Sequence, residues 1–276
     1  MTRELKLRIV SGLVLGAVAL ADTWIGGPAF AVLSAVIGLA VWYEWATMTR
    51  VAVADRAVYL LGWAVQLGVA ALIILGGDAY ALPLLVIATL VAAFWSRFHG
   101  RGWWLPGGVL YAGATTISLA AIRGDSDVGF VAMLYVFAVV WATDILAYFI
   151  GRAIGGPKLA PAISPGKTWS GAIGGAVSGV AAGTLVFAAF FSVDDLRIPL
   201  IALVLSVASQ AGDLFESYVK RRSGVKDSGR IIPGHGGVWD RVDGLVAASF
   251  VALFIALGEA LAGANGGEIG AVLLGL

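Results

Sequence analysis

Long apolar runs separated by short polar segments occupy nearly the whole chain. The apolar runs lie at approximately 9–22, 25–48, 57–76, 80–98, 105–123, 129–150, 170–191, 197–213 and 243–263. Most of them approach the ~20 residues that a helix needs to cross the hydrocarbon core of a bilayer. No alternating barrel pattern is present, and backbone groups in lipid must be hydrogen-bonded internally. The pattern therefore predicts an all-α fold, a polytopic integral membrane helix bundle with about nine transmembrane helices.

The composition agrees with a membrane-embedded bundle. Hydrophobic residues make up 60% of the chain and charged residues only 13%, whereas a soluble domain carries roughly 25% charged residues. Many of the 38 glycines lie inside the apolar runs, where small residues let helices approach closely. The absence of cysteine excludes disulfides and thiolate metal sites.

The placement of basic residues predicts the orientation in the membrane. With the N-terminus in the cytoplasm, every Lys and Arg except Arg123 and Arg197 falls on the cytoplasmic side. These cytoplasmic residues include Arg3, Lys6, Arg8, Arg50, Arg56, Arg97, Arg101 and Arg152. The outer loops instead carry Asp22, Asp78, Asp125, Asp127, Asp194 and Asp195. The positive-inside rule favours this orientation and an odd number of spans.

The first apolar span has two interpretations. A basic start, an apolar run and the sequence Ala19-Leu20-Ala21 resemble a secretory signal with its cleavage site. The next apolar span follows almost immediately, which favours a helix that is retained.

Two cytoplasmic segments, residues 151–169 and 214–242, are more polar than the other loops. Both combine Gly, Pro, Lys and Ser, a composition typical of an anion-binding loop rather than a linker. We therefore divide the chain into N-terminal transmembrane helices, residues 1–128, and a C-terminal catalytic transmembrane region, residues 129–276, which contains both segments.

The first polar segment follows an acidic residue inside an apolar span. Asp144 lies near the cytoplasmic half of that span, where an ionisable group is costly and indicates a functional site. The alternative is a helix-end Asp bonded to a neighbouring Arg. Farther along, Ser164, Lys167 and Thr168 precede a new helix, whose first N–H groups can bind phosphate. The Walker A pattern is absent, and a basic loop facing anionic lipid head groups is the alternative.

The second polar segment and its flanks combine five acidic and six basic residues between two spans. On a helix, Asp213, Glu216 and Lys220 share a face, and so do Asp240 and Asp243. Two helices entering the membrane can thus direct two carboxylate pairs at each other. Mg²⁺ usually binds one or two carboxylates plus substrate phosphate, and nearby cations bind phosphate oxygens. The layout favours metal-assisted phosphoryl chemistry, and a salt-bridged cytoplasmic hairpin is the alternative.

Two single residues have open interpretations. His235 lies in a Pro-Gly-His-Gly-Gly turn, where the backbone can approach a ligand closely and a histidine can act as acid or base near neutral pH. A structural role for His235 is equally open. Glu44, between Tyr43 and Trp45, is either functional or a helix-end charge between aromatic belt residues. His99 is expected to lie in a short cytoplasmic turn at the membrane interface.

The segment Ser217–Asp243 resembles the signature of the CDP-diacylglycerol synthase (phosphatidate cytidylyltransferase) family at every constrained position. The matching positions are Ser217, Val219, Lys220, Arg221, Lys226, Asp227, Gly229, Ile232, Pro233, His235, Gly236, Gly237, Val238, Asp240, Arg241, Val242 and Asp243. Asp144, the stretch Ser164–Trp169, Gly212-Asp213 and, more weakly, Glu44-Trp45 also resemble the family. Ser170 stands where the family often has Glu or Gln. The likeness covers the C-terminal half well.

The resemblance implies transfer of the cytidylyl group of CTP to phosphatidate, which gives CDP-diacylglycerol and pyrophosphate for phospholipid biosynthesis. It implies Mg²⁺ dependence, with two divalent ions or one together with a monovalent cation, and with Asp213 and Asp240 as metal ligands. It further implies a homodimer in the cell inner (cytoplasmic) membrane, with the active site facing the cytoplasm. Membrane lipid is an expected partner, and nucleic acid is not.

On this interpretation the candidate residues fall into two further groups. The candidate catalytic residues are Asp144, Lys167, Lys226, Asp227, His235, Arg241 and Asp243. The candidate substrate-binding residues are Ser164, Thr168, Ser217, Lys220, Arg221, Gly236 and Gly237. The cationic members would neutralise phosphates, and Asp227 and His235 would orient the loop and the substrate.

Two other functions compete with this interpretation. A related CTP-dependent membrane enzyme acting on an isoprenoid lipid would share the phosphate chemistry and differ in its acceptor, but the closeness of the 217–243 signature argues against it. An ion-coupled transporter would be expected to show inverted repeats and paired broken helices, and the sequence shows neither.

Overall fold

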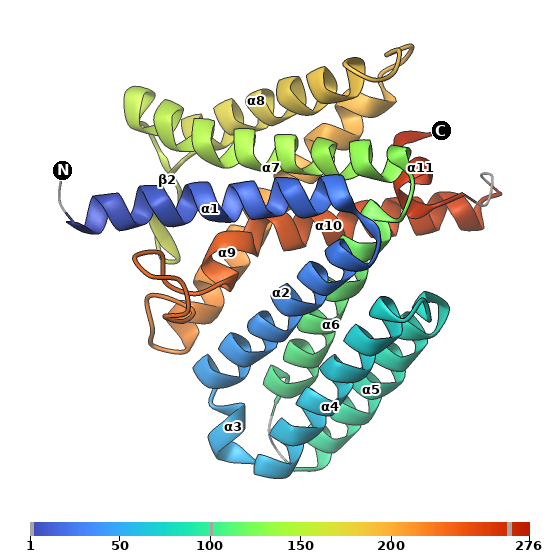
Figure 1. Ribbon diagram of the computed structural model, residues 1–276. Coiled ribbons are helices and arrows are strands. Elements are labelled where there is room, and N and C mark those ends of the chain that lie inside the picture. Colours follow the sequence, from blue (N-terminus) through green and yellow to red (C-terminus); the bar gives the residue numbers. More distant parts are fainter. Residues whose placement is uncertain (1–2, 100–101, 264–266) are drawn as a thin grey trace. The chain divides into compact units, whose positions relative to one another are not determined.

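The computed structural model describes residues 3–99, 102–263 and 267–276, and these are mostly helical (Figure 1). The helices are α1 (Arg3–Ile25), α2 (Gly27–Met48), α3 (Val51–Ala54), α4 (Arg56–Ile74), α5 (Asp78–Phe98), α6 (Trp104–Arg123), α7 (Asp127–Ile154), α8 (Trp169–Ala188), α9 (Arg197–Arg222), α10 (Trp239–Leu261) and α11 (Ile269–Leu274). The strands are β1 (Lys158–Ala160) and β2 (Ser164–Thr168). Arg101, one of the basic residues used to predict orientation, lies outside the described residues, as do the side chains of Arg3, Lys6 and Arg8.

The helices confirm the predicted polytopic all-α fold. Within the described residues, eight helices are long and apolar enough to cross a membrane, namely α2 and α4 to α10. The first predicted span corresponds to a shorter apolar stretch, Val10–Ile25 of α1. Three helices extend from the predicted spans into the polar segments, since α7 reaches Ile154, α9 reaches Arg222 and α10 begins at Trp239. The extensions of α9 and α10 carry candidate site residues that a search for apolar runs leaves out.

The chain forms two compact units. The first contains residues 1–120 and 222–241, and the second contains residues 121–221 and 242–276. The second polar segment is therefore shared, because its loop belongs to the first unit and the acidic stretch of α9 belongs to the second. The predicted division at residue 128 was based on function and stays a prediction.

Large aromatic side chains packed on glycines form the core of the first unit. Trp42 of α2 lies over Gly62 of α4, and Trp45 lies over Gly108 of α6. The Trp45 indole N–H donates to the carbonyl of Trp104 at 2.7 Å. The Trp45 ring also stacks on Trp239, with the ring centroids 5.2 Å apart. These contacts join α2, α6 and the start of α10 within one unit.

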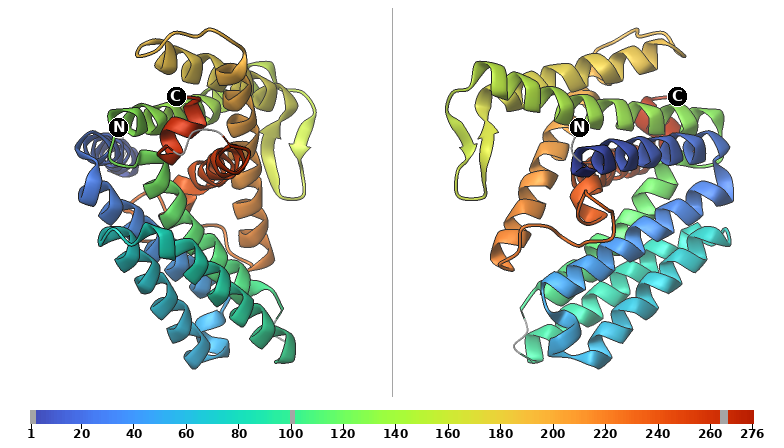
Figure 2. Two further views of the ribbon diagram at one scale, coloured as in Figure 1. Left: turned by 90° about the vertical axis from the view of Figure 1, so that its right-hand side faces the viewer. Right: turned by 60° about the vertical axis from the view of Figure 1, so that its left-hand side comes forward.

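A stripe of glycines lets α7 and α8 of the second unit lie side by side (Figures 1 and 2). Gly171, Gly175, Gly179 and Gly183 recur at every fourth position of α8, and all four are buried. A Cβ atom at Gly175 would lie only 2.7 Å from the carbonyl oxygen of Thr143 in α7. Small residues at this spacing permit the close backbone approach that favours helix association in membranes. The stripe therefore fixes the start of α8 beside the polar end of α7.

The predicted polar loop between α7 and α8 contains a β-hairpin, which the sequence analysis did not predict. Strands β1 and β2 are antiparallel, with Lys158 opposite Thr168 and Ala160 opposite Ser164. The Trp169 N–H donates to the Pro157 carbonyl at 3.0 Å. Figure 2 shows the hairpin projecting beyond the ends of the two helices. Its Pro and Gly residues interrupt the alternation of apolar and polar residues by which strands are recognised.

We expect Gly175→Ala to lower the thermal unfolding temperature, because the new methyl group would meet backbone and side-chain atoms of α7. Overpacking of this kind typically costs about 1–3 kcal/mol. Gly258→Ala in α10 is the matched control, because a Cβ atom there meets nothing within 4 Å. Thermal unfolding of both variants in detergent measures the difference, and equal unfolding temperatures would refute the packing role of the stripe.

Candidate active site

A cavity of about 590 Å³ in the second unit is lined by residues of α7, the hairpin, α8 and α9. Its size lies within the range of small-molecule sites, roughly 300–1,000 Å³. The charged residues of its lining are Asp144, Arg152, Lys158, Lys167 and Asp213. Ala147, Leu159 and Ala172 contribute apolar surface. The cavity thus combines cationic groups, two carboxylates and an apolar wall.

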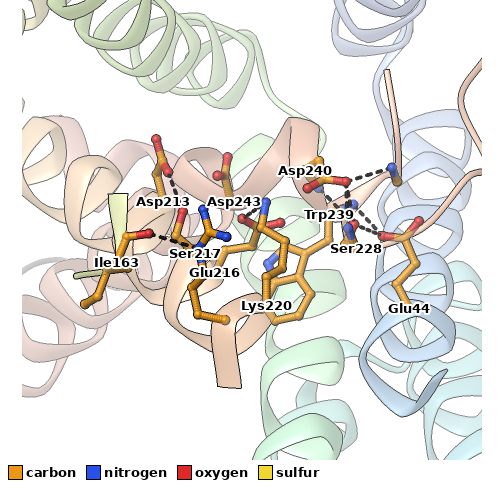
Figure 3. A network of polar contacts seen from close by, with 12 residues as sticks. Glu44, Ile163, Asp213, Glu216, Ser217, Lys220, Ser228, Trp239, Asp240 and Asp243 are labelled. Carbon is orange, nitrogen blue, oxygen red and sulfur yellow. Dashed lines mark hydrogen bonds and ion pairs between the residues drawn. The ribbon is translucent and has the colours of Figure 1, made fainter. Parts of the chain in front are cut away.

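An ion pair connects two sides of this cavity. The Lys167 ammonium group of β2 contacts the Oδ2 atom of Asp213 in α9, and the two side chains are 27% and 30% exposed. One helical turn later, the Ser217 hydroxyl makes a long hydrogen bond of 3.5 Å to Oδ1 of Asp213 (Figure 3). Asp144 of α7 lies within electrostatic range of both Lys167 and Asp213. The structure therefore brings together three candidate residues from three separate elements.

Close helix approach in the second unit brings Asp243 near the same carboxylates. A Cβ atom at Gly212 of α9 would lie 2.7 Å from the Asp243 carbonyl oxygen in α10. A Cβ atom at Gly244 would lie 3.5 Å from a carboxylate oxygen of Asp144. Asp243 lies within electrostatic range of Asp213 and Asp144. Small residues at the crossing therefore allow carboxylates of α7, α9 and α10 to lie within electrostatic range of one another.

The start of α8 forms the helix terminus that was predicted to bind phosphate. Thr168 is the N-cap of α8, and its hydroxyl accepts a hydrogen bond from the Gly171 N–H at 3.1 Å. Ser170 donates to the carbonyl of Gly155, so the position that departs from the family pattern stabilises the turn after α7. Ser164 and Thr168 both line the cavity. Their contact with substrate stays a prediction.

Two cationic candidates in α9 contact groups of the protein (Figure 3). Lys220 forms an ion pair with the buried Glu216. The Arg221 guanidinium donates to the Ile163 carbonyl in the hairpin at 3.4 Å. The Lys220 contact lies within α9, whereas the Arg221 contact joins α9 to the hairpin. A substrate-binding role for either cation stays a prediction.

In the first unit, the loop Ser228–Asp240, here called the 228–240 loop, surrounds one oxygen of Asp240. Oδ2 of Asp240 accepts hydrogen bonds from the N–H groups of Ser228 and Gly237, each at 2.8 Å, and from the Ser228 hydroxyl at 3.0 Å. These three donors fix the orientation of the Asp240 carboxylate. Gly236 has a φ of +85°, a conformation that glycine adopts readily.

Further candidates of the first unit lie around the same loop. Lys226 and Asp227 line a second cavity, of about 660 Å³, together with Tyr43 and Thr47 of α2. Arg241 lies in the first turn of α10, and its N–H donates to the carbonyl of Val238 at 3.0 Å.

Two residues of this region, Ser11 and Ser228, were not predicted from the sequence, and the role of Glu44 was left open. The Nδ1 atom of His235 lies 2.6 Å from the hydroxyl of Ser11 in α1, a contact that no sequence motif indicates. Ser228 occupies an unconstrained position of the signature. Glu44 is fully buried against the loop. Its position among aromatic residues was a weak signal of function.

The carboxylates of the second unit fit the donor preference of Mg²⁺. Within the parts of the chain that the structure describes, no three His, Cys, Asp or Glu side chains gather as a metal site. Mg²⁺ needs fewer protein ligands, since it usually binds one or two carboxylates and completes its coordination shell with phosphate and water. Asp144 and Asp213, which line one cavity, are suitable oxygen donors. Asp213 and Asp240 lie in different units, so their pairing as metal ligands stays a prediction.

Comparison with known proteins decides the family. Residues 6–257 match the sequence profile of the cytidylyltransferase family. The chain belongs to this family. Among relatives named phosphatidate cytidylyltransferase, that of Brucella abortus (strain 2308) is 49% identical over 249 residues, 89% of this chain and 91% of the relative. The relative from Rickettsia bellii is 36% identical over 183 residues, which are 64% of this chain and 79% of the relative. The Haemophilus influenzae relative is 48% identical over 144 residues, which are 50% of this chain and 49% of the relative.

The comparisons confirm the cytidylyltransferase resemblance that was read from Ser217–Asp243. The family match extends well beyond that signature into the N-terminal helices, which had resembled the family only as generic apolar spans. Membership of an enzyme family argues against the transporter interpretation, and the names of the relatives do not favour an isoprenoid acceptor.

We expect Thr168→Val to destabilise the start of α8, because the isosteric side chain cannot accept the hydrogen bond from the Gly171 N–H. Loss of an N-cap typically costs ~1 kcal/mol. Hydrogen–deuterium exchange of the first turn of α8 should accelerate. Ser178→Ala is the control, because that hydroxyl donates only to the Gly174 carbonyl within the helix. Unchanged exchange in Thr168→Val would show that the cap does not hold this helix start.

Proposed function

We propose that this chain transfers the cytidylyl group of CTP to phosphatidate and so produces CDP-diacylglycerol and pyrophosphate for phospholipid biosynthesis. Relatives named phosphatidate cytidylyltransferase support the proposal, one of them 49% identical over most of both chains. The structural observation that carries it is the Lys167–Asp213 ion pair within a cavity lined by cationic and apolar residues.

The character of the cavity suits a lipid phosphate. Phosphatidate combines a phosphate monoester with two apolar chains, so its site needs cations beside an apolar, membrane-facing surface. Arg152, Lys158 and Lys167 supply the cations. Near the cavity, Phe149 of α7 and Ile173 of α8 expose large apolar side chains, as expected for membrane-spanning helices.

The reaction forms one P–O bond and breaks another. An oxygen of the phosphatidate phosphate attacks the α-phosphorus of CTP, and the bond between that phosphorus and the oxygen bridging to the β-phosphate breaks, which releases pyrophosphate. A phosphate monoester is largely ionised near neutral pH, so the nucleophile needs no strong base. The obstacle is the mutual repulsion of two polyanions, which preorganised positive groups such as Lys167 offset.

The family resemblance implies Asp213 and Asp240 each as a metal ligand, with Asp144 and Asp243 as further carboxylates for a second divalent ion or a monovalent cation. When bound, Mg²⁺ supplies positive charge to the triphosphate and to the departing pyrophosphate. The Lys167 ammonium, which contacts Asp213, would then be available to a phosphate oxygen. Lys226 and Arg241 are the corresponding cations of the first unit, while Asp227 and His235 orient the loop.

The proposal includes a location and an assembly. We propose that the active site faces the cytoplasm, where CTP is available, and that the chain lies in the inner (cytoplasmic) membrane. The basic segments of the sequence and the long apolar helices support this location. A homodimer is part of the proposal on the basis of the family resemblance.

An assay of detergent-purified protein with phosphatidate, radiolabelled CTP and Mg²⁺ tests the function. We expect labelled CDP-diacylglycerol, and we expect EDTA to remove the activity and added Mg²⁺ to restore it. A parallel reaction with an isoprenoid lipid should give no product. Folded protein that yields no product with phosphatidate would refute the proposal.

Replacement of the proposed metal ligands should stop turnover without preventing membrane insertion. We expect Asp213→Ala and Asp240→Ala to lower kcat by at least ~10²-fold, the size of loss seen when one electrostatic contact to the transition state is removed. Asp194→Ala, in the exposed segment between α8 and α9, is the control and should keep normal activity. Near-normal kcat in Asp240→Ala would exclude this carboxylate as a ligand.

A further inference from the structure

Glu44, near the end of α2, is a buried carboxylate whose solvent exposure is 0%. Its Oε1 atom accepts a hydrogen bond from the Val238 N–H at 2.8 Å. Its Oε2 atom accepts from the Trp239 N–H at 2.9 Å and from the Ser228 hydroxyl at 2.7 Å. A buried charge is strongly unfavourable unless such donors replace water. Two of these donors are N–H groups at the start of α10, which have no acceptor within the helix itself. A negative charge at this position is also favoured by the helix dipole.

The Ser228 hydroxyl connects Glu44 to Asp240 (Figure 3). Its oxygen lies 2.7 Å from Oε2 of Glu44 and 3.0 Å from Oδ2 of Asp240. A hydroxyl has a single proton to donate, so the two carboxylates share one donor. The same hydroxyl oxygen accepts from the Asp240 N–H at 3.3 Å. The orientation of Asp240 is therefore coupled to the position of Glu44.

The loop backbone packs directly on the Glu44 carboxylate. A Cβ atom at Gly229 would lie 2.6 Å from Oε1 of Glu44, and one at Gly237 would lie 2.5 Å from both carboxylate oxygens. Trp45, the next residue of α2, stacks on Trp239. Consecutive residues of α2 thus hold the 228–240 loop by charge and by aromatic contact. Packing on Glu44 also explains why Gly229 and Gly237 of the family signature lack a side chain, without any contact to a ligand.

We infer that Glu44 is a positioning residue of the cytidylyl transfer, which holds the 228–240 loop so that Asp240 presents its carboxylate in one fixed orientation. The inference rests on the proposed function. Glu44 acts through Ser228 and the loop amides. Its contribution should consequently fall on the rate of the chemical step and leave the binding of the lipid substrate intact.

The substitution Glu44→Gln isolates this role. The three donors contact both oxygens of Glu44, so a glutamine of the same shape turns an N–H group toward at least one of them. Donors then face each other without an acceptor, and the loop loses its fixed position. Trp42→Phe is the matched control, because Trp42 also lies buried on α2 but packs on Gly62 of α4.

The first measurement is hydrogen–deuterium exchange of residues 228–239 in full-length protein, without CTP, lipid or metal. We expect the amides of Val238 and Trp239 to exchange at least ~10-fold faster in Glu44→Gln than in the unsubstituted protein, and to be unchanged in Trp42→Phe. Unchanged exchange in Glu44→Gln would overturn the inference.

The second measurement separates kcat from KM. We expect Glu44→Gln to lower kcat by about 10–100-fold, the range for residues that orient a metal ligand, with the KM for phosphatidate within about twofold. Ser228→Ala should lower kcat similarly, and the double variant should lose much less than the product of the two effects, because both act through one network. Normal kcat in Glu44→Gln, or an equal kcat loss in Trp42→Phe, would contradict the positioning role.

The two proposals fail in different ways. If the unsubstituted protein makes no CDP-diacylglycerol, the proposed function is wrong, and the exchange measurement still tests whether Glu44 holds the loop. If the unsubstituted protein is active and Glu44→Gln is equally active, the function stands and the inference about Glu44 is wrong.

Discussion

A carboxylate near an apolar helix costs free energy unless donors or cations surround it, and the polar parts of both units are arranged around that constraint. Asp213 is paired with Lys167, and Glu216 is paired with Lys220. In the first unit, backbone N–H groups and the Ser228 hydroxyl surround Asp240 and Glu44. The same arrangement gives a site for phosphate chemistry, because a cation that neutralises a carboxylate can also neutralise a phosphate.

The glycine stripe of α8 allows this arrangement in the second unit. Where the backbones of α7 and α8 approach closely, the polar end of α7 and the N-cap of α8 lie together, and the intervening residues can form a short hairpin that carries Lys167. The Arg221 contact to Ile163 joins that hairpin to α9. Residues without side-chain chemistry therefore determine where the charged ones meet, which explains why the glycines and the charges cannot be interpreted separately.

The sequence predicted the helices well and the site only in part, for physical reasons. Apolar runs of about 20 residues have few alternatives in a bilayer, so the spans agree with α2 and α4 to α10. The hairpin and the short α3 carry no comparable signal. Asp144 could be selected because charge inside an apolar run is unusual, Lys167 because it precedes a helix start that can bind phosphate, and Asp213 because it shares a helix face with Glu216 and Lys220. Contacts such as Ser11 with His235 and Glu44 with Ser228 join residues about 180 or more positions apart, which one sequence does not reveal.

The family signature itself combines two kinds of position. Gly237 packs on Glu44, Lys220 pairs with Glu216, and Arg221 reaches the hairpin, so contacts within the protein already account for these residues. Lys226 and Asp227 instead line a cavity of about 660 Å³ beside the loop that holds Asp240. Charged groups that line a cavity have their chemistry available to a ligand, as Lys167 and Asp213 do in the second unit. Lys220 and Arg221 line neither of these two cavities, so we expect Lys226 and Asp227, rather than these two cations, to contact the nucleotide or the lipid phosphate.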